Sequence, residues 1–329
     1  MTSVLITGAS GQDGSYLIDL LRSQGYAIHA QSRSGPPTDA ATDVIWHVCS
    51  LTEPYAIERL LGKIRPDEIY NLAAVSRPAL AWTIPSETTE LNAVVPQRIC
   101  EWIARNAPAT RLFQASSSEI FGDSDDAVQT ETTCLRPRSI YGISKAFAHQ
   151  MAGAYRTHYG LHVSCGILFN HESPRRPLGF VVQKIAHAAA AISLGKTETA
   201  ELDERGRPIV RDGKLALGNI QARRDFSFAG DVARAMHMMV RAPVGDDFVI
   251  GSGETHSIAD VCASAFGAVG LDWTQHVTTD DALLRPVDAT TTRADPGRIK
   301  QALGWHPTLS FAELVGLMVK ERRELLDGL

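Results

Sequence analysis

A tyrosine and a lysine lie four residues apart in the string from Tyr141 to Lys145. On an α-helix this spacing places both side chains on one face, one turn apart. A phenol titrates near ~10, so a tyrosine acts as a base at neutral pH only where a nearby cation stabilises the phenolate. Lys145 can supply that cation and can also bind a cofactor ribose. The pair predicts proton transfer at a hydroxyl or carbonyl group, although a surface tyrosine beside a solvated lysine has the same spacing.

Three serines and a glutamate, Ser116 to Glu119, directly follow an apolar run that ends at Ala115. Hydroxyl groups at the end of a strand can hydrogen-bond a reacting oxygen, and an adjacent carboxylate can move a proton. Taken alone, the string is also compatible with an ordinary polar turn and a solvated carboxylate. Together with the tyrosine and lysine, it predicts a catalytic group made of Ser117, Ser118, Glu119, Tyr141 and Lys145.

A glycine-rich turn, Thr7 to Gly14, connects the apolar stretch Ser3–Ile6 to an amphipathic helix that begins at Ser15. In such turns the first glycine permits a tight bend, the second lets the backbone approach a pyrophosphate, and the third lets helix and strand pack closely. The helix N-terminus adds N–H groups and a positive dipole end. A glycine turn without a ligand is the alternative. The motif predicts dinucleotide binding by Gly8, Gly11, Gln12, Asp13 and Gly14.

The end of the expected second strand bears on which dinucleotide binds. It reads Gln31-Ser32-Arg33-Ser34 and lacks the Asp or Glu that binds the ribose 2′-hydroxyl in NAD sites of this type. Arg33 can pair with a 2′-phosphate instead, and an exposed loop cation is the competing interpretation. The sequence therefore favours NADP(H).

The elements that must position these groups alternate along the first half of the chain. Near-continuous apolar strands are expected at 4–6, 27–30, 44–48, 68–72, 111–115 and 163–168, and helices at 15–23, 53–63, 88–106 and 141–159. This alternation predicts a doubly wound parallel (Rossmann) α/β sheet with helices on both faces. Helices are also expected at 231–241, 257–268 and 310–327.

The regular alternation ends near residue 169, which suggests a domain boundary. We expect residues 1–168 to form an NADP-binding domain, with 220–252 returning to it. Residues 169–329 are expected to form mainly a smaller ligand-binding lobe over the carboxyl ends of the strands, where ligands bind in such folds. The charged and turn-rich residues 197–214 are expected to form an exposed hairpin or loop.

Composition excludes several classes of protein. A net charge of -5 gives no basic stripe for nucleic acid, and no apolar run approaches the ~20 residues of a membrane helix. The first residues lack the features of an export signal, and the five cysteines are scattered, so we expect reduced thiols and a cytoplasmic location. No histidine pair or cluster with Asp or Cys is apparent, so no metal is expected.

Strings over nearly the whole chain resemble the extended short-chain dehydrogenase/reductases and, within them, the GDP-mannose 4,6-dehydratase family. The most specific strings are Gly-Gln-Asp-Gly at 11–14 and Asn-His-Glu-Ser-Pro-Arg-Arg at 170–176. Others lie at 7–17, 69–74, 114–122, 141–146, 217–226 and 253–257.

The resemblance implies a role for each catalytic residue. Tyr141 would take the proton of the sugar C4 hydroxyl while hydride passes from C4 to the nicotinamide, and Lys145 would lower the tyrosine pKa. Glu119 would remove the C5 proton and help to expel water from C6, to which the hydride returns. Ser117 would hold the C4 oxygen, with Ser118 in support. The implied product is GDP-4-keto-6-deoxy-mannose, with no net redox change.

The resemblance also implies further contacts. The cofactor would be contacted by Leu51, Leu72, Ala74, Ser76, His171 and Arg176, together with Tyr141 and Lys145. The lobe expected over 169–329 would mainly bind the sugar nucleotide, expected to be GDP-mannose. Its contacts would be Asn170, Lys184, Asn219, Arg224, Arg285 and Asp288. Arginine side chains suit a diphosphate because their forked N–H groups pair with its oxygens.

Assembly follows from the same resemblance. Members of the family pair subunits through the helix that bears Tyr141 and the helix over 88–106, and join dimers through a loop that is short here, after Arg33. We therefore expect a homodimer rather than a tetramer. The apolar positions compatible with that interface, or with burial inside one subunit, are Ile99, Ile103, Phe147, Met151 and Tyr155.

Two other functions remain open from the sequence. A related nucleotide-sugar 4-keto reductase or epimerase would share the tyrosine and lysine. A non-catalytic dinucleotide-binding regulator would share the fold, although it would have no need of a proton-transfer tyrosine.

Overall fold

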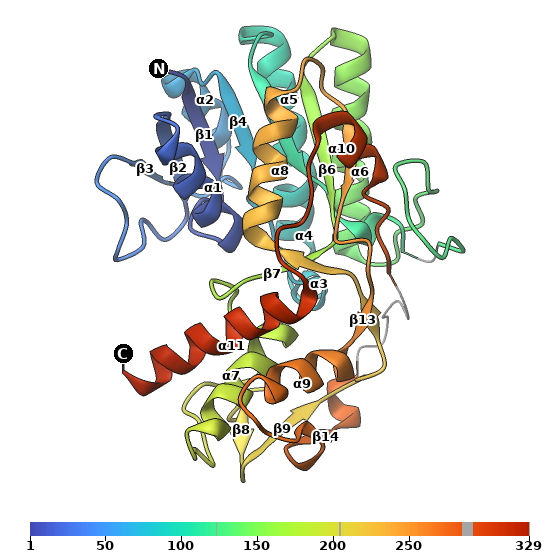
Figure 1. Cartoon of the computed structure of the whole chain (residues 1–329). Helices are drawn as coiled ribbons and strands as arrows, with labels where there is room; N and C mark the ends of the chain where they lie inside the picture. Colours follow the sequence, from blue (N-terminus) through green and yellow to red (C-terminus); the bar gives the residue numbers. More distant parts are fainter. Residues whose placement is uncertain (123, 204, 285–291, 329) are drawn as a thin grey trace. The chain divides into compact units, whose positions relative to one another are not determined.

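Seven parallel strands form the central sheet, in the order β12-β6-β5-β4-β1-β2-β3 (Figure 1). The computed structural model describes residues 1–122, 124–203, 205–284 and 292–328. The strands are β1 (Ser3–Thr7), β2 (Ala27–Ser32), β3 (Ile45–Val48), β4 (Glu68–Asn71), β5 (Arg111–Ala115), β6 (Val163–Leu168) and β12 (Asp247–Ile250). The expected doubly wound parallel sheet is confirmed.

Helices cover both faces of this sheet. On β1, Val4 and Ile6 face the side packed by α1 (Gln12–Ser23), α8 (Ala229–Arg241) and α10 (Gly297–Leu303). Leu5, between them, faces the side packed by α2 (Ala56–Ile64), α5 (Val95–Asn106) and α6 (Ile140–Tyr159). Both sides of each central strand are therefore buried, which explains why the strands read as unbroken apolar runs.

The helix expected over 88–106 is interrupted. The structure has α4 (Pro85–Thr89), a π-helical turn η1 (Glu90–Val94) and then α5, with a shorter helix α3 (Pro78–Ala81) before them. Pro96 lies at the start of α5, where its missing N–H and its ring prevent a regular helical hydrogen bond to the preceding turn. On α5, Ile99 and Ile103 are fully buried within the chain, so they are unavailable to a second subunit.

Helix α6 has clear boundaries. The Ser139 hydroxyl accepts a hydrogen bond from the Gly142 N–H at 2.9 Å, and Gly160 ends the helix in the left-handed conformation with φ 65°. Its buried face includes Tyr141 and Lys145, while Ile143 and Phe147 are exposed. The helix thus presents one face to the interior of its own unit and an apolar face outward.

The edge strand β12 does not present all of its backbone to solvent. The Glu131 carboxylate accepts a hydrogen bond from the Val249 N–H at 2.8 Å, and Gln129 pairs with Ala294 in an isolated bridge nearby. Burial raises the pKa of the Glu131 carboxyl, against the lowering effect of that hydrogen bond. The segment before α6 therefore covers one edge of the sheet.

The chain divides into two compact units. The first comprises residues 1–169, 230–250 and 294–306, and the second comprises 170–229, 251–293 and 307–329. Relative to the expected domains, 220–229 lies in the second unit and 294–306 lies in the first, because Trp305 is buried in the core beside α8 and donates to the Asp231 carbonyl at 2.8 Å.

The second unit has a helical core with short strands. Helices α7 (Val181–Ser193), α9 (Ile258–Gly267) and α11 (Phe311–Asp327) pack around shared apolar residues. Its strands are β7 (Asn170–Glu172), β8 (Val210–Arg211), β9 (Lys214–Leu217), β10 (Arg223–Arg224), β11 (Phe226–Phe228), β13 (His256–Ser257) and β14 (Val277–Thr279). They form a β10-β13 pair, a β7-β11 pair and a β8-β9-β14 sheet, with 3₁₀ turns η3 (Trp273–Gln275) and η4 (Asp281–Leu283).

Candidate active site

The side chain of Lys145 is buried at the carboxyl end of β5. Its Nζ donates a hydrogen bond to the Ala115 carbonyl at 2.9 Å and lies 6.0 Å from the centroid of the Tyr141 ring. Burial lowers the pKa of Lys145 to about 8, and the negative charge of Asp13 acts in the opposite direction. Lys145 and Tyr141 thus share the buried face of α6, and burial brings the lysine pKa closer to neutral pH. Their role in proton transfer stays a prediction.

The serine and glutamate string forms a tight turn next to this pair. The Ser117 hydroxyl accepts a hydrogen bond from the Glu119 N–H at 3.3 Å and caps the 3₁₀ turn η2 (Ser118–Ile120). A Cβ atom built on Gly142 would lie 2.6 Å from the Glu119 carbonyl oxygen, so this glycine allows α6 to approach the turn. The structure thereby brings the five predicted catalytic residues to one end of β5.

The glycine turn after β1 has the close packing that the motif predicts. Gly8 has φ +65°, and a Cβ atom there would lie 2.8 Å from the backbone of Ala73. A Cβ atom on Gly14 would lie 2.5 Å from the Ala9 carbonyl oxygen. Both positions require glycine, because a side chain would overlap backbone that cannot move aside.

A chain of buried amides and hydroxyls joins the glycine turn to Lys145. Thr7 donates to the Asn71 side-chain oxygen at 2.6 Å, and the Asn71 amide donates to Gln114 at 2.8 Å. Gln114 in turn donates to the Ala115 carbonyl at 2.9 Å, the same oxygen that accepts from Lys145. Sequence reasoning gave no role to Asn71 or Gln114, although polar side chains at the last positions of apolar strands were the available signal.

The other predicted cofactor residues of the first unit follow β3 and β4. Leu51 is buried, Leu72 and Ala74 are half-buried, and Ser76 is exposed. The N–H groups of Leu72 and Ala73 donate to the Thr7 hydroxyl at 3.1 and 3.2 Å. The segment after β4 is therefore attached to the end of β1, beside the glycine turn.

Arg33 lies just beyond β2 and already has a partner. Its Nη1 is 2.9 Å from a carboxylate oxygen of Glu87, and the two side chains are 68% and 39% exposed. An ion pair this accessible contributes only about 0–1 kcal/mol. Gln31 attaches the same strand end to the glycine turn, since it accepts from the Gly8 N–H at 3.0 Å and donates to the Cys49 carbonyl at 2.7 Å. Gln31 was not singled out from the sequence as a contact of the glycine turn.

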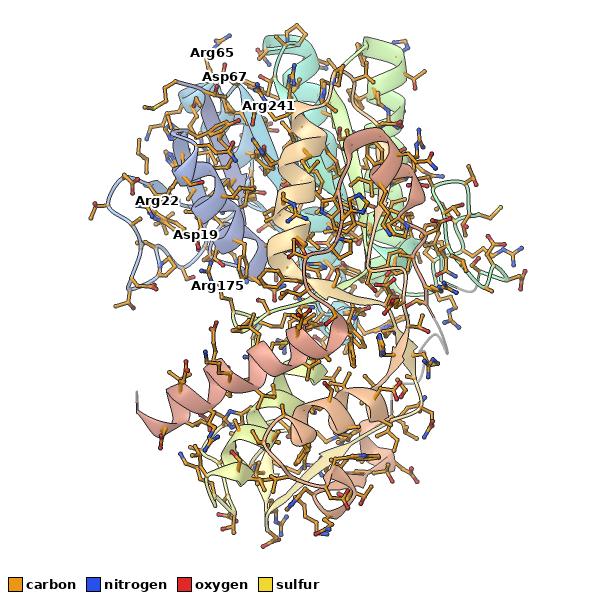
Figure 2. All side chains as sticks on the ribbon, in the orientation of Figure 1. Asp19, Arg22, Arg65, Asp67, Arg175 and Arg241 are labelled. Atoms are coloured by element: carbon orange, nitrogen blue, oxygen red, sulfur yellow. The ribbon has the colours of Figure 1, made fainter. Side chains whose placement is uncertain are left out.

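Charged residues at the amino ends of the strands lie away from this group. Arg241, labelled in Figure 2, donates to the buried carboxylate of Glu68 at 3.1 Å, and Tyr70 donates to the same side chain at 3.0 Å. Glu68 opens β4, whereas the predicted site residues follow the strand ends. This second polar cluster therefore supports the fold and not the chemistry.

The remaining predicted residues belong to the second unit. Asn170 and His171 lie on β7 opposite Phe226 and Ser227 of β11. The Arg176 guanidinium lies 3.6 Å from the centroid of the Phe180 ring. Lys184 is buried on α7, Arg224 lies on β10, and Asn219 is exposed after β9. Arg285 and Asp288 lie outside the described residues.

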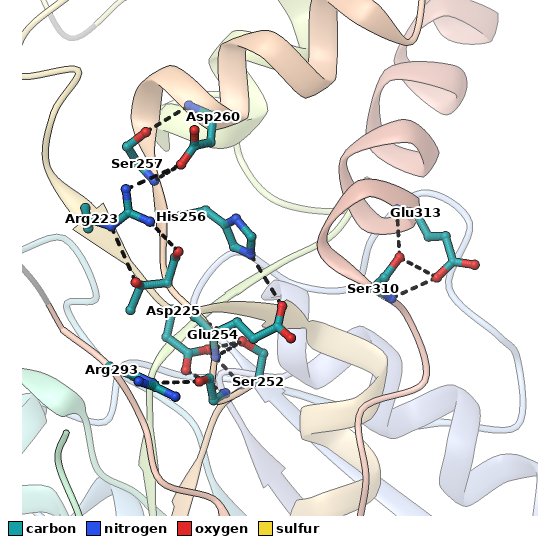
Figure 3. A network of polar contacts seen from close by, with 12 residues as sticks. Arg223, Asp225, Ser252, Glu254, His256, Ser257, Asp260, Arg293, Ser310 and Glu313 are labelled. Atoms are coloured by element: carbon teal, nitrogen blue, oxygen red, sulfur yellow. Dashed lines mark hydrogen bonds and ion pairs between the residues drawn. The ribbon is translucent and has the colours of Figure 1, made fainter.

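A polar network surrounds the strand that carries Arg224. The buried carboxylate of Asp225 accepts from the N–H and hydroxyl of Ser252, both at 2.7 Å, and from the N–H of Gly253 at 2.8 Å (Figure 3). Arg223 donates to the Thr255 carbonyl at 2.7 Å, and Arg293 donates to that of Gly253 at 2.8 Å. Sequence reasoning did not identify Asp225, which fixes the loop after β12 beside β10.

The expectation that no histidine clusters with Asp or Cys was wrong. His149, Cys165 and Asp247 place ligand-type atoms within 4.8 Å of one another, because α6, β6 and β12 bring residues far apart in sequence together. The Asp247 carboxylate accepts two hydrogen bonds from Arg156, at 2.8 and 2.7 Å. The guanidinium already balances its charge, so a metal remains unexpected there.

Two observations concern the chain as a whole. Within the described ranges, no helix has both the length and the apolar character that a membrane crossing needs. The five cysteines are free thiols.

Comparisons with known proteins agree with this geometry. A model of the GDP-mannose 4,6 dehydratase family matches residues 5–318. GDP-mannose 4,6 dehydratase 1 of Arabidopsis thaliana is 38% identical over 339 residues, which cover 98% of this chain and 90% of that protein. Among solved structures, UDP-glucose 4-epimerase of Thermotoga maritima has a TM-score of 0.85 at 21% identity, covering 99% of this chain and 100% of that one. MoeE5 in complex with UDP-glucose and NAD has a TM-score of 0.80 at 25% identity, covering 98% and 99%.

Proposed function

The chain belongs to the GDP-mannose 4,6-dehydratase family, and we propose that its catalytic group is Ser117, Ser118, Glu119, Tyr141 and Lys145. The protein is a hydro-lyase that converts GDP-mannose into GDP-4-keto-6-deoxy-mannose and uses a nicotinamide dinucleotide. The observation that supports the residue assignment most directly is the burial of Lys145 beside Tyr141, next to the turn that carries Glu119.

The glycine turn fits the pyrophosphate of such a cofactor, because Gly8 and Gly14 stand where no side chain has room. We propose that Gly8, Gly11, Gln12, Asp13 and Gly14 hold it, with Leu51, Leu72, Ala74, Ser76, His171 and Arg176 as further contacts. The bound nicotinamide supplies a hydride acceptor for the sugar C4 and a donor for C6.

Each protein group then moves or holds a proton at a stated atom. Tyr141 accepts the proton of the C4 hydroxyl, and the Lys145 ammonium stabilises the phenolate that receives it. Ser117 and Ser118 hydrogen-bond the C4 oxygen. Glu119 removes the C5 proton, made acidic by the adjacent ketone, and returns a proton to the C6 hydroxyl as it leaves as water. The proton held by Tyr141 passes to C5 as C6 is reduced, so both protein groups return to their starting states and no external oxidant or reductant is needed.

We further propose that the cofactor is NADP(H) rather than NAD(H). The support is Arg33 at the end of β2, where its guanidinium is exposed enough to exchange the Glu87 carboxylate for a 2′-phosphate. For the sugar nucleotide we propose Asn170, Lys184, Asn219, Arg224, Arg285 and Asp288, whose cationic members suit a diphosphate.

We propose that the protein is a homodimer in the cytoplasm. The support for pairing is the outer face of α6, where Ile143 is 55% exposed and Phe147 is 41% exposed. Met151 continues this face and is half-buried, whereas Tyr155 packs against the core of its own unit. The burial of Ile99 and Ile103 removes α5 residues from the expected set. Free cysteines and the lack of a membrane-spanning helix among the described residues are compatible with that location.

The activity is tested by incubating purified protein with GDP-mannose and a catalytic amount of NADP⁺. We expect a product lighter by one water, with no net change in the cofactor absorbance. Consumption of one NADPH for each 4-keto substrate would instead indicate a reductase. Binding of dinucleotide without turnover of any common nucleotide sugar would indicate a regulator.

A further inference from the structure

Residues 197–214 are anchored in the second unit, not exposed throughout as expected from their charge. The Thr199 N–H donates to the Val210 carbonyl at 3.2 Å, and the Ile209 N–H donates to the Glu201 carbonyl at 2.9 Å. Ile209 and Val210 are buried in the core shared by α7, α9 and α11. The segment is therefore a hairpin with a buried base and a charged tip.

The tip is a tight turn organised by one carboxylate. Asp203 accepts from the N–H groups of Arg205 and Arg207, at 2.8 and 2.9 Å, and from the Arg207 side chain at 3.1 Å. Gly206 takes the left-handed conformation that the turn requires, with φ +73°. The turn therefore holds both arginine side chains on a fixed backbone.

Both arginines contact one short segment, Asp280–Leu284. Arg207 Nη1 lies 2.9 Å from Asp280 Oδ2, and Arg205 donates to the Ala282 carbonyl. On its other side, the segment is attached to β9, because the Asp280 N–H donates to the Leu217 carbonyl at 2.8 Å.

The residue after β9 packs against the same segment. A Cβ atom on Gly218 would lie 2.6 Å from the Leu283 carbonyl oxygen. The segment is thus held between the hairpin tip and the end of β9. One of the proposed substrate residues adjoins this arrangement, since Asn219 follows Gly218.

We propose that Arg205 and Arg207 are positioning residues for the sugar nucleotide, whose site they shape by fixing Asp280–Leu284 and the end of β9. This inference rests on the substrate contact proposed above for Asn219. Because the hairpin contacts the segment through side chains at its tip, it sets affinity for the sugar nucleotide and leaves the proton-transfer group unchanged.

The first test compares Arg207→Ala with Arg211→Ala. Arg211 is a matched control, since it lies in the same hairpin and pairs only with Asp212 at 3.6 Å among the ion pairs of the described residues, with both side chains at least 70% exposed. We expect Arg207→Ala to raise the Kd for GDP and the KM for GDP-mannose by about ten-fold. The value of kcat and the Kd for NADP(H) should stay within about two-fold of those of the unmodified protein. Arg211→Ala should change neither the Kd for GDP nor the KM for GDP-mannose.

The second test isolates the contact with the segment. Asp280→Asn removes the charge that pairs with Arg207 but retains an oxygen that can accept from the Ala282 N–H, which Asp280 now caps at 2.9 Å. The double variant Arg207→Ala/Asp280→Asn should bind GDP no more weakly than Arg207→Ala alone, because both substitutions break the same contact between Arg207 and Asp280.

Several results would overturn the inference. A lower melting temperature with unchanged GDP affinity would assign the hairpin a purely structural role. Equal losses in GDP affinity, NADP(H) affinity and kcat would indicate general disruption. Binding of GDP by calorimetry does not require turnover, so an enzyme inactive on GDP-mannose would refute the proposed function while leaving this test valid.

Discussion

The two regions assigned to catalysis and to substrate recognition are built from different kinds of contact. Around Lys145, the polar groups are buried, and their hydrogen bonds form a continuous chain across the carboxyl ends of β1, β4 and β5. Around Asp280, partly exposed side chains meet through ion pairs and turns. Buried hydrogen bonds are costly to leave incomplete, whereas exposed ion pairs are easily screened. The first region should therefore tolerate almost no change, and the second should tune affinity.

The most severe test of this contrast removes one phenolic oxygen. Tyr141→Phe should lower kcat by about 10²–10⁴-fold, because the proton acceptor for the C4 hydroxyl is lost. The Kd values for NADP(H) and GDP should change by less than about two-fold, since the ring and the helix remain. Tyr159→Phe, on the exposed end of the same helix, is the control and should be fully active. Substantial turnover by Tyr141→Phe would assign the base to another residue.

The Arg156–Asp247 pair of the first unit has two hydrogen bonds and side chains that are each 21% exposed. It should matter more for stability than the Arg207–Asp280 pair of the second unit, whose side chains are 39% and 29% exposed. Asp247→Asn leaves Arg156 without its carboxylate and should lower the free energy of unfolding at pH 7 by about 3 kcal/mol. Asp280→Asn should cost less than about 1 kcal/mol. Denaturant unfolding of both variants measures the difference, and equal costs would contradict the contrast.

The same pair makes a prediction about pH. Burial alone would raise the pKa of Asp247, but the Arg156 hydrogen bonds and the charge of His149 hold it below its usual value. A carboxyl whose pKa is lowered on folding stabilises the protein above its unfolded pKa and loses that contribution as the pH falls through the folded value. The stability difference between the protein and Asp247→Asn should therefore shrink in acid. A difference independent of pH would show that packing, not charge, causes the loss.

Cofactor choice should respond to an exposed residue by a smaller factor. Arg33→Ala should remove most of the preference for NADP(H) over NAD(H), about ten-fold to a hundred-fold, because charge-assisted hydrogen bonds contribute about 1.5–3 kcal/mol. Glu87→Gln should strengthen NADP(H) binding by about two-fold to five-fold, because Arg33 no longer has to release the Glu87 carboxylate before it binds the 2′-phosphate. Equal affinities of the unmodified protein for both cofactors would refute the role of Arg33.

The smallest expected effect is a shift of a pH profile. The pKa of Lys145 is about 8, and the charge of Asp13 opposes the effect of burial. The kcat/KM profile should therefore fall as the lysine loses its proton above about pH 8. Asp13→Asn should move this alkaline limb to lower pH, because one favourable charge is gone. An unmoved limb would assign it to a different group.

Sequence patterns predicted the features that depend on the geometry of a single turn or helix. The glycine turn and the Tyr141 and Lys145 pair depend on spacing within one turn or helix, so the sequence alone places them. The pairs Arg33–Glu87 and Arg156–Asp247 join residues separated by 54 and 91 positions, and nothing in a single sequence indicates such partners. The interrupted helix before α5 had a signal in Pro96, which the apolar periodicity of the surrounding residues masked.

The buried chain from Thr7 through Asn71 to Gln114 also limits how these positions can vary. Replacing Asn71 alone would strand a donor on one side and an acceptor on the other, each at a cost of about 1–3 kcal/mol. Replacing neighbouring members together by apolar groups of similar shape would strand neither, and is expected to be nearly neutral. Among homologues, these positions should therefore change together. A substitution at one of them should be accompanied by substitutions at its hydrogen-bonding neighbours.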